Sequence, residues 1–228
     1  MKRFLLLLLA CTLFRVDSFG QLSVTTDIKS RYIWRGIDMG DSPNFQPGLT
    51  YKHGNLNLGV CGAYSFAGTG SVYAENDFWL VYDVPLSNGT VSFLCTDLFF
   101  PSAGRKFFNL KGDGTGAHTL EIGLQYVGPV QIPMAIRLYA DAYNDPENSS
   151  YVEIAYPFTV DGISVISFLG FAGRQSVIYR TNGIGITNFG LTATKIVVVT
   201  ESFTVPVSTS FIVNPSLEQS YVVFGVSF

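Results

Sequence analysis

The stretch SVTTDIKSRYIWRGIDMG, residues 23–40, alternates between two kinds of side chain. Its odd positions are mostly polar or charged: Ser23, Thr25, Asp27, Lys29, Arg31 and Arg35. Its even positions up to residue 34 are apolar or small: Val24, Thr26, Ile28, Ser30, Tyr32 and Trp34. Such alternation predicts a β-strand, because successive side chains of a strand point to opposite faces. We therefore expect a first strand over residues 23–35 with one charged face and one apolar face that ends in aromatic rings.

The same period of two recurs along the chain, and no segment after residue 20 keeps helical spacing over three turns. The further segments lie near residues 45–52, 56–66, 75–84, 91–95, 119–126, 134–141, 151–158, 163–173, 182–199, 203–213 and 219–228. Gly183, Gly185 and Gly190 indicate bulges or bends in the tenth strand. This pattern predicts an all-β protein with a single closed antiparallel transmembrane β-barrel of about 12 strands, between about 10 and 14.

The predicted connections alternate between short and long. Short links lie at residues 54–55, 85–89, 128–129, 161–162 and 201–202. Longer links span residues 36–44, 67–72, 100–115, 143–149, 174–181 and 214–218. Short periplasmic turns and longer extracellular loops are typical of outer-membrane barrels.

The first 20 residues predict a cleaved secretory signal peptide. Two basic residues precede an apolar run from Phe4 to Leu13, and small residues occupy positions 18 and 20. A transmembrane anchor is the alternative, but it needs roughly 20 apolar residues. A second alternative to the cleaved signal peptide is a lipoprotein signal with its modified cysteine at Cys11. Residues 21–228 then form one domain, the barrel.

Charge is scarce in this chain. Charged residues make up 14% of it, against about 25% in ordinary soluble domains. Residues 21–228 carry 11 basic and 16 acidic side chains, a net charge of −5. Nucleic-acid binding requires a basic face, so we expect no nucleic-acid partner.

Alternation alone also fits a soluble sandwich or a lipocalin-like barrel whose apolar face is the core. The predicted strands, however, are long, and a strand tilted by about 45° needs roughly 9–11 residues to cross a bilayer. Aromatic residues also gather near the ends of the apolar series, as in the two girdles of a membrane barrel. The predicted girdle consists of Tyr32, Trp34, Tyr51, Tyr64, Tyr82, Tyr126 and Tyr156.

A sheet in a bilayer must close, because hydrocarbon satisfies no open backbone edge, and its polar face then lines the lumen. The predicted pore-lining residues are Asp27, Lys29, Arg31, Arg35, Lys52, Glu75, Asp77, Glu121, Arg137, Asp141 and Glu153. Two interpretations stay open. The arginines pair with the carboxylates and block a narrow barrel, or opposite charges on facing walls leave a water-filled constriction.

The last strand ends in alternating Val222, Phe224, Val226 and Phe228. A terminal aromatic after such a strand resembles the signal by which bacterial barrels are passed to the barrel assembly machinery. On that resemblance the four side chains face lipid and the machinery is a partner.

No residue pattern indicates catalysis, a metal site or a cofactor. His53 is placed at a short turn and His118 on the lipid side near the loop rim, and neither lies close along a strand to both a serine and a carboxylate. The segment KGDGTG, residues 111–116, is interpreted as a loop. Cys61 and Cys95 fall on opposite faces of strands that are not neighbours, so no disulfide is expected.

The segment DIKSRYIWRGIDMGDSPNFQPGLTYKHGNLNLGV resembles the start of the TorF family of outer-membrane porins. The family motif is a strand with an aromatic-x-x-Arg-Gly step, a short loop and a Gln-Pro/Gly-x-x-x-Tyr strand. Its positions here are Tyr32, Arg35, Gly36, Gln46, Gly48 and Tyr51. The resemblance is sharpest over residues 27–60. It implies a barrel and a pore, and it names no substrate.

We therefore expect a non-enzymatic porin in the outer membrane that passes small hydrophilic solutes through a narrow charged lumen. The first alternative is a closed structural or adhesive barrel with a salt-bridged interior, whose loops bind a partner. The second is a soluble periplasmic ligand-binding barrel.

Overall fold

The structure is a computed structural model that describes residues 20–66 and 73–228. Its twelve long strands have the following bounds: β1 Gln21–Lys29, β4 Asn44–His53, β5 Leu56–Ser65, β6 Ala74–Leu86, β7 Gly89–Phe99, β8 His118–Val127, β9 Ala135–Tyr143, β10 Ser150–Val160, β11 Ile163–Ala172, β14 Gly185–Thr200, β15 Phe203–Asn214 and β16 Gln219–Ser227. Four two-residue strands form two small hairpins, β2 Ile33–Trp34 with β3 Ile37–Asp38, and β12 Gln175–Ser176 with β13 Thr181–Asn182. A 3-10 turn, η1, covers Pro101–Ala103.

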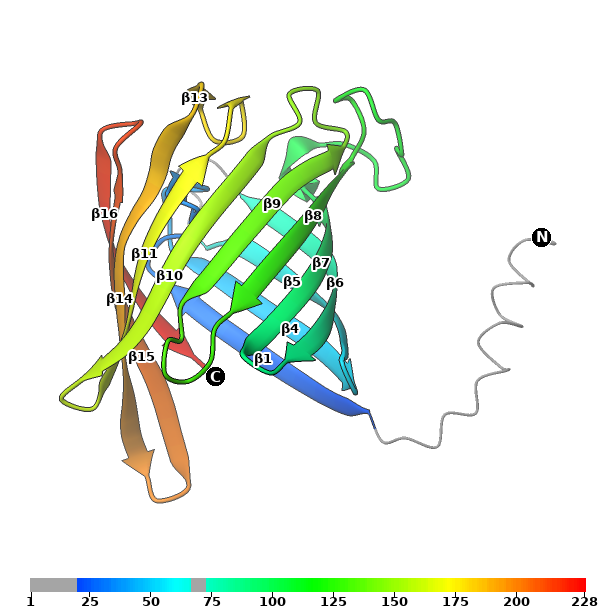
Figure 1. Cartoon of the computed structure of the whole chain (residues 1–228). Helices are drawn as coiled ribbons and strands as arrows, with labels where there is room; N and C mark the ends of the chain where they lie inside the picture. Colours follow the sequence, from blue (N-terminus) through cyan, green and yellow to red (C-terminus); the bar gives the residue numbers. More distant parts are fainter. Residues whose placement is uncertain (1–19, 67–72) are drawn as a thin grey trace.

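The twelve long strands close into one antiparallel barrel, each paired with its neighbours in the order of the chain (Figure 1). This confirms the predicted fold class. The circle closes where β1 meets β16: Asp27 pairs with Ser227, Ile28 with Val226 and Lys29 with Gly225. Backbone hydrogen bonds between Thr26 and Phe228 extend this seam.

The alternation places apolar side chains on the outer surface and polar ones inside. On β8, Ile122 is 51% exposed, whereas the inward-facing Glu121 is 5% exposed. Phe78, Leu80 and Tyr82 repeat the outward series on β6. The inside therefore carries the charges and the outside the large apolar groups, as the sequence predicts.

Short and long connections lie at opposite ends of the barrel (Figure 1). We call these the turn end and the loop end. The turn end holds residues 54–55, 87–88, 128–134, 161–162 and 201–202, and the loop end holds residues 30–43, 100–117, 144–149, 173–184 and 215–218. The link after Val127 is longer than the predicted 128–129. β14 and β15 reach beyond their neighbours at the turn end (Figure 1).

The predicted first strand is wrong at its end. β1 stops at Lys29, and residues 30–43 leave the wall and carry the β2–β3 hairpin. At Ser30 the backbone N–H still donates to the Phe224 carbonyl at 2.8 Å, but the side-chain hydroxyl takes the place of a backbone carbonyl and accepts the Phe224 N–H at 2.9 Å. The predicted tenth strand is also two elements, β13 and β14, and its pairing with β11 is bulged opposite Gly170.

Three smaller predictions have different outcomes. Cys61 pairs across from the inward Asp77 and Cys95 from the outward Leu80, so the two free thiols face opposite sides as expected. The signal peptide and the link 67–72 lie outside the described residues. Within the described part, no helix is long and apolar enough to cross a membrane.

Candidate functional site

The β2–β3 hairpin occupies the lumen at the loop end. Its two-residue turn consists of Arg35 and Gly36, with φ of 50° and 81°. Two positive φ values define the turn type whose twist suits a two-residue hairpin. The Gly36 carbonyl accepts a hydrogen bond from the Asn214 amide at 3.0 Å. A Cβ at position 36 would collide with the Thr187 carbonyl oxygen, so only glycine fits against the β14 wall.

Arg35 is the centre of this lumenal cluster. Its two terminal nitrogens donate to both oxygens of Glu121, at 2.5 and 2.9 Å, across 86 positions of sequence. The guanidinium carbon also lies 3.9 Å from the Tyr139 ring centroid, 4.4 Å from Trp34 and 4.8 Å from Tyr151. A bidentate ion pair enclosed by aromatic rings holds the hairpin in one position.

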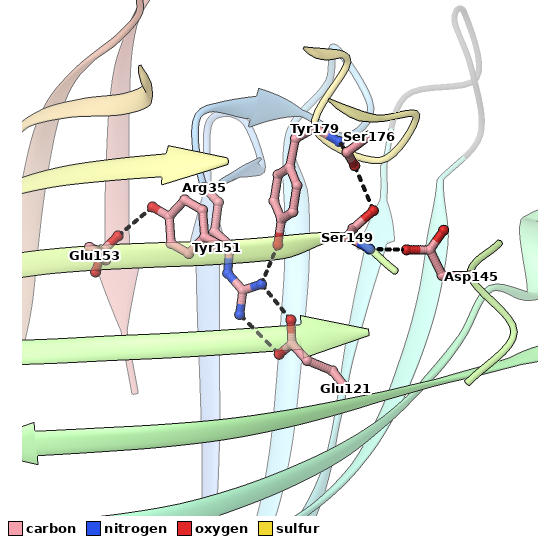
Figure 2. A network of polar contacts seen from close by, with 8 residues as sticks. All are labelled: Arg35, Glu121, Asp145, Ser149, Tyr151, Glu153, Ser176 and Tyr179. Atoms are coloured by element: carbon pink, nitrogen blue, oxygen red, sulfur yellow. Dashed lines mark hydrogen bonds and ion pairs between the residues drawn. The ribbon is translucent and has the colours of Figure 1, made fainter. Parts of the chain in front are cut away.

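The β12–β13 hairpin adds Tyr179 to the cluster from above (Figure 2). Arg35 donates to the Tyr179 hydroxyl at 2.6 Å, and the Tyr179 ring stacks on Trp34 with centroids 5.5 Å apart. Burial raises the pKa of Tyr179, which keeps it a neutral phenol. Its loop is held to the neighbouring loop, because the Ser149 and Ser176 hydroxyls lie 2.7 Å apart.

A second polar network continues from Tyr151 along the lumen (Figure 2). The Tyr151 hydroxyl donates to Glu153 at 2.7 Å, and Arg137 donates to the other Glu153 oxygen at 2.7 Å. The Asn188 amide reaches Glu153 at 3.0 Å from β14. Side chains from β9, β10 and β14 are thereby joined across the interior.

Beyond these networks the lumen contains a cavity of about 430 Å³, which we call the lumen cavity. Charged groups line one part of it: Asp27, Lys29, Arg31, Arg35, Arg137 and Glu153. The wall of β14, β15 and β16 contributes five hydroxyl groups, those of Thr192, Thr194, Ser208, Ser210 and Ser227. It also contributes Asn188, Gly225 and the apolar Pro206, Ile212 and Val223. This wall carries no full charge among the cavity-lining residues, and a space of this size holds many water molecules.

A second cavity of about 500 Å³, the outer pocket, lies at the loop end. Its lining residues are Arg31, Asp38, Met39, Gly40, Asp41, Arg180, Gln219, Ser220 and Tyr221. Arg31 forms ion pairs with Asp38, at 3.2 Å, and with Asp41. One of the two interpretations of the sequence pairs the arginines with the predicted pore-lining carboxylates. The partners of Arg31 in the structure are outside that set and belong to the inserted segment itself.

The predicted pore-lining residues lie inside the barrel, but at different depths. Lys52 is exposed near the turn end, whereas Glu75 and Asp77 lie on β6 below Tyr32 beside a smaller cavity of about 180 Å³. Asp141 is 2% exposed, lies directly across from Glu121, and its carboxylate has no hydrogen-bond partner among the described residues. Arg31 and Arg35 line the lumen from the inserted segment rather than from β1.

The aromatic girdle is partly wrong. Tyr32 and Trp34 are inside: Tyr32 lines the smaller cavity and Trp34 stacks on Tyr179. Neither ring lies on the outer face, because the chain turns into the lumen after Lys29. The other members lie on strands with partly exposed, outward rings: Tyr51, Tyr64, Tyr82, Tyr126 and Tyr156. The side chains of Val222, Phe224 and Phe228 also point outward.

Sequence reasoning missed several residues of the cluster: Tyr139, Tyr151, Tyr179, Asn188 and Asn214. Alternation does place Tyr139 and Tyr151 on the inward series of adjacent strands, and two large rings there are a usable signal. Tyr179 lies in an irregular loop, and no local pattern indicates its inward position.

His118 has a carboxylate partner after all. Its Nδ1 lies 2.9 Å from Asp97 and its Nε2 lies 2.5 Å from the Phe107 carbonyl. Both ring nitrogens therefore face acceptors, which leaves none to activate a serine as a triad requires. The contact holds the link 100–117 against the outer wall.

Within residues 20–66 and 73–228, no group of three or more His, Cys, Asp or Glu side chains is placed to hold a metal ion. Comparison of the chain with protein-family models, curated proteins and solved structures finds no match. The geometry of the lumen is therefore the basis for a functional conclusion.

Proposed function

We propose that the chain is an outer-membrane barrel that passes small hydrophilic solutes through the uncharged side of its lumen. The observation that carries this proposal is the lumen cavity of about 430 Å³ in a closed barrel whose outer surface is apolar.

The outer surface supports a bilayer environment. Large apolar side chains such as Phe93, Ile122 and Leu191 are 54%, 51% and 43% exposed. Their exposure to water would be unfavourable by about 25 cal/mol for each Å². The long strands have 9 to 16 residues, enough for a tilted strand to cross hydrocarbon. Outward rings at both ends of the strands agree with aromatic girdles.

The lumen supports passage rather than complete closure. The Arg35 cluster fills the side near β8, β9 and β10, while the hydroxyl groups of β14 to β16 border the lumen cavity. Hydroxyl groups bind water and polar solutes without selecting strongly for one charge. We therefore infer that solutes follow this wall.

Single-channel recording in planar bilayers tests the proposal. Purified, folded barrel should give discrete current steps, and Ser208→Trp should reduce them because the ring enters the lumen cavity. Thr209→Trp is the matched control, since residue 209 pairs with the outward Phe224. Absence of current at every voltage from correctly folded protein, or equal effects of the two substitutions, contradicts the proposal.

A second candidate is a closed structural or adhesive barrel whose loops bind a partner. It is favoured by the Arg35–Glu121 pair and the rings around it, which together fill one side of the lumen. This candidate predicts a folded barrel without conductance.

The proposed location adds three further elements. Residues 1–20 direct secretion and are removed, the strand ending in Phe228 is recognised by the barrel assembly machinery, and outer-membrane lipid surrounds the wall. Removal of Phe228 should lower the amount of assembled protein more than the stability of the barrel once folded. The resemblance to the TorF porins points the same way and remains a proposal.

A further inference from the structure

Arg31 separates the two larger cavities of the barrel interior. It lines both the outer pocket and the lumen cavity, and no other described residue lines both. A route from the loop end into the lumen along β16 therefore passes this side chain.

The side chain of Arg31 spans the space between the inserted hairpin and the wall. On one side its Nε lies 3.2 Å from Asp38 of β3, and it also pairs with Asp41. On the other side its guanidinium carbon lies 5.8 Å from the Tyr221 ring centroid on β16. The backbone just before it is fixed by the two hydrogen bonds between Ser30 and Phe224. The base of Arg31 is therefore fixed. Beside it, Ile33 of the hairpin packs against the wall cluster of Ile212, Tyr221 and Val223. The Arg31 side chain is the charged part of this boundary between the two cavities.

The two arginines of the inserted segment differ in how firmly they are held. The Arg35 side chain is 12% exposed and makes a bidentate pair with a buried carboxylate. The Arg31 side chain is 33% exposed; its partner Asp41 is 74% exposed and its partner Asp38 is 17% exposed. An ion pair open to water, such as that of Arg31 with Asp41, is weak and opens and closes readily. Arg35 is suited to anchoring the hairpin and Arg31 to movement.

We propose that Arg31 is the gate of the solute route: paired with Asp38 and Asp41 it closes the connection between the two cavities, and released from them it opens it. This inference rests on the proposed pore function and adds to it the site at which passage is controlled and its charge selected. The gate contains one arginine and two aspartates, so removing the positive charge and removing the negative charges should shift the ion selectivity in opposite directions.

The test is conductance and reversal potential of the full-length protein in planar bilayers under a potassium chloride gradient. Arg31→Ala should raise the conductance and shift the reversal potential toward cation selectivity, since the Asp38 and Asp41 carboxylates lose their counter-ion. The double substitution Asp38→Asn with Asp41→Asn should also raise the conductance, but it should shift the reversal potential toward anion selectivity. The turn should persist, because an asparagine oxygen at 38 still accepts the N–H groups of Gly40 and Asp41.

Arg137→Ala is the matched control. It removes the same charge from a residue that lines the lumen cavity alone and pairs with Glu153 on the wall. It should shift selectivity without the rise in conductance. For each comparison, the wild type and the variants should migrate equally on gels without heating, which shows that all of them are folded.

The outcomes separate the two proposals. A wild-type barrel that conducts, with Arg31→Ala unchanged or indistinguishable from Arg137→Ala, overturns the gate and leaves the pore intact. A silent wild type contradicts the open pore of the proposed function; conduction that appears once Arg31 is replaced then supports the gate as one that is closed in the wild type. Silence of the wild type and of both gate variants contradicts the pore and the gate together. Should Arg31→Ala fail to fold, the double asparagine variant alone decides, because a shift toward cations would contradict the proposal.

Discussion

The two sides of the barrel interior are built from different chemistry. Near β8, β9 and β10, the filled side, Arg35 is enclosed by Glu121 and aromatic rings. Near β14, β15 and β16, the open side, hydroxyl groups such as Thr192 and Ser210 border the lumen cavity. The difference shows that the charged side chains of this lumen are distributed unevenly around its wall. The Arg35–Glu121 pair fixes the inserted hairpin, whereas the lumen cavity is lined by charged groups on one part and by uncharged groups on the other.

The largest effect should come from the centre of the filled side. Arg35→Ala leaves Glu121 buried without its partner, and losing one member of a buried pair costs about 3–5 kcal/mol. Arg137→Ala, whose pair is more exposed, should cost roughly 1 kcal/mol or less. Denaturant unfolding in detergent micelles measures both. Equal costs would show that the filled side has no special anchor.

On the outer surface, a charged substitution should destabilise the barrel equally beside the filled side and beside the open side. Ile122→Arg beside the filled side and Leu191→Arg beside the open side should each cost about 2–4 kcal/mol, because both place a cation against hydrocarbon. Thr194→Arg, facing the lumen cavity on the open side, should cost much less. Folding into lipid vesicles at a series of urea concentrations gives the three values. A large cost for Thr194→Arg alone would reverse the assigned faces.

The contact of the inserted hairpin with β14 should contribute less to the stability of the barrel. Gly36→Ala places a Cβ in a left-handed backbone conformation against the Thr187 carbonyl, and strain of this kind costs about 1–3 kcal/mol. Gly162 has a similar φ, 76°, but nothing lies within 4 Å of its Cβ position, so Gly162→Ala should fall at the lower end of that range. Unfolding free energies compare them. If Gly162→Ala lowers the unfolding free energy more than Gly36→Ala does, the contact with β14 does not hold the hairpin in place.

The smallest effect belongs to the open side. Thr192→Val removes a hydrogen bond to Ser210 of 2.8 Å, and such a loss costs about 0.5–1.5 kcal/mol. Water in the lumen cavity can replace the lost partner, so we expect the lower end. Chemical denaturation of wild type and variant gives the difference. A loss of unfolding free energy clearly above this range would indicate that water does not reach this part of the lumen wall.

The sequence predicted the barrel because its strands repeat one simple rule. Outward and inward residues such as Ile122 and Glu121 differ in polarity, and the turns that join neighbouring strands are local. Pairing partners follow from chain order in an antiparallel meander, so the topology needed no long-range information.

The inserted hairpin was not predictable in the same way. Alternation continues through Tyr32 and Trp34, so the pattern does not distinguish a longer β1 from a chain that turns inward. The Arg35–Gly36 pair carries a turn signal, since a two-residue turn with glycine second favours this hairpin type. What holds Arg35 there is Glu121, and a contact across 86 residues has no local signature.

The central claim is that the outward series meets hydrocarbon, and quenching of single tryptophans by brominated lipids tests it most directly. Both native tryptophans face the lumen series, so Trp34→Phe leaves Trp79 as an inward probe, paired with the lumenal Gly59. Phe93→Trp in a protein lacking both native tryptophans gives an outward probe. Strong quenching at position 93 and weak quenching of Trp79 is the expected result. Equal quenching, or stronger quenching of Trp79, would contradict the account.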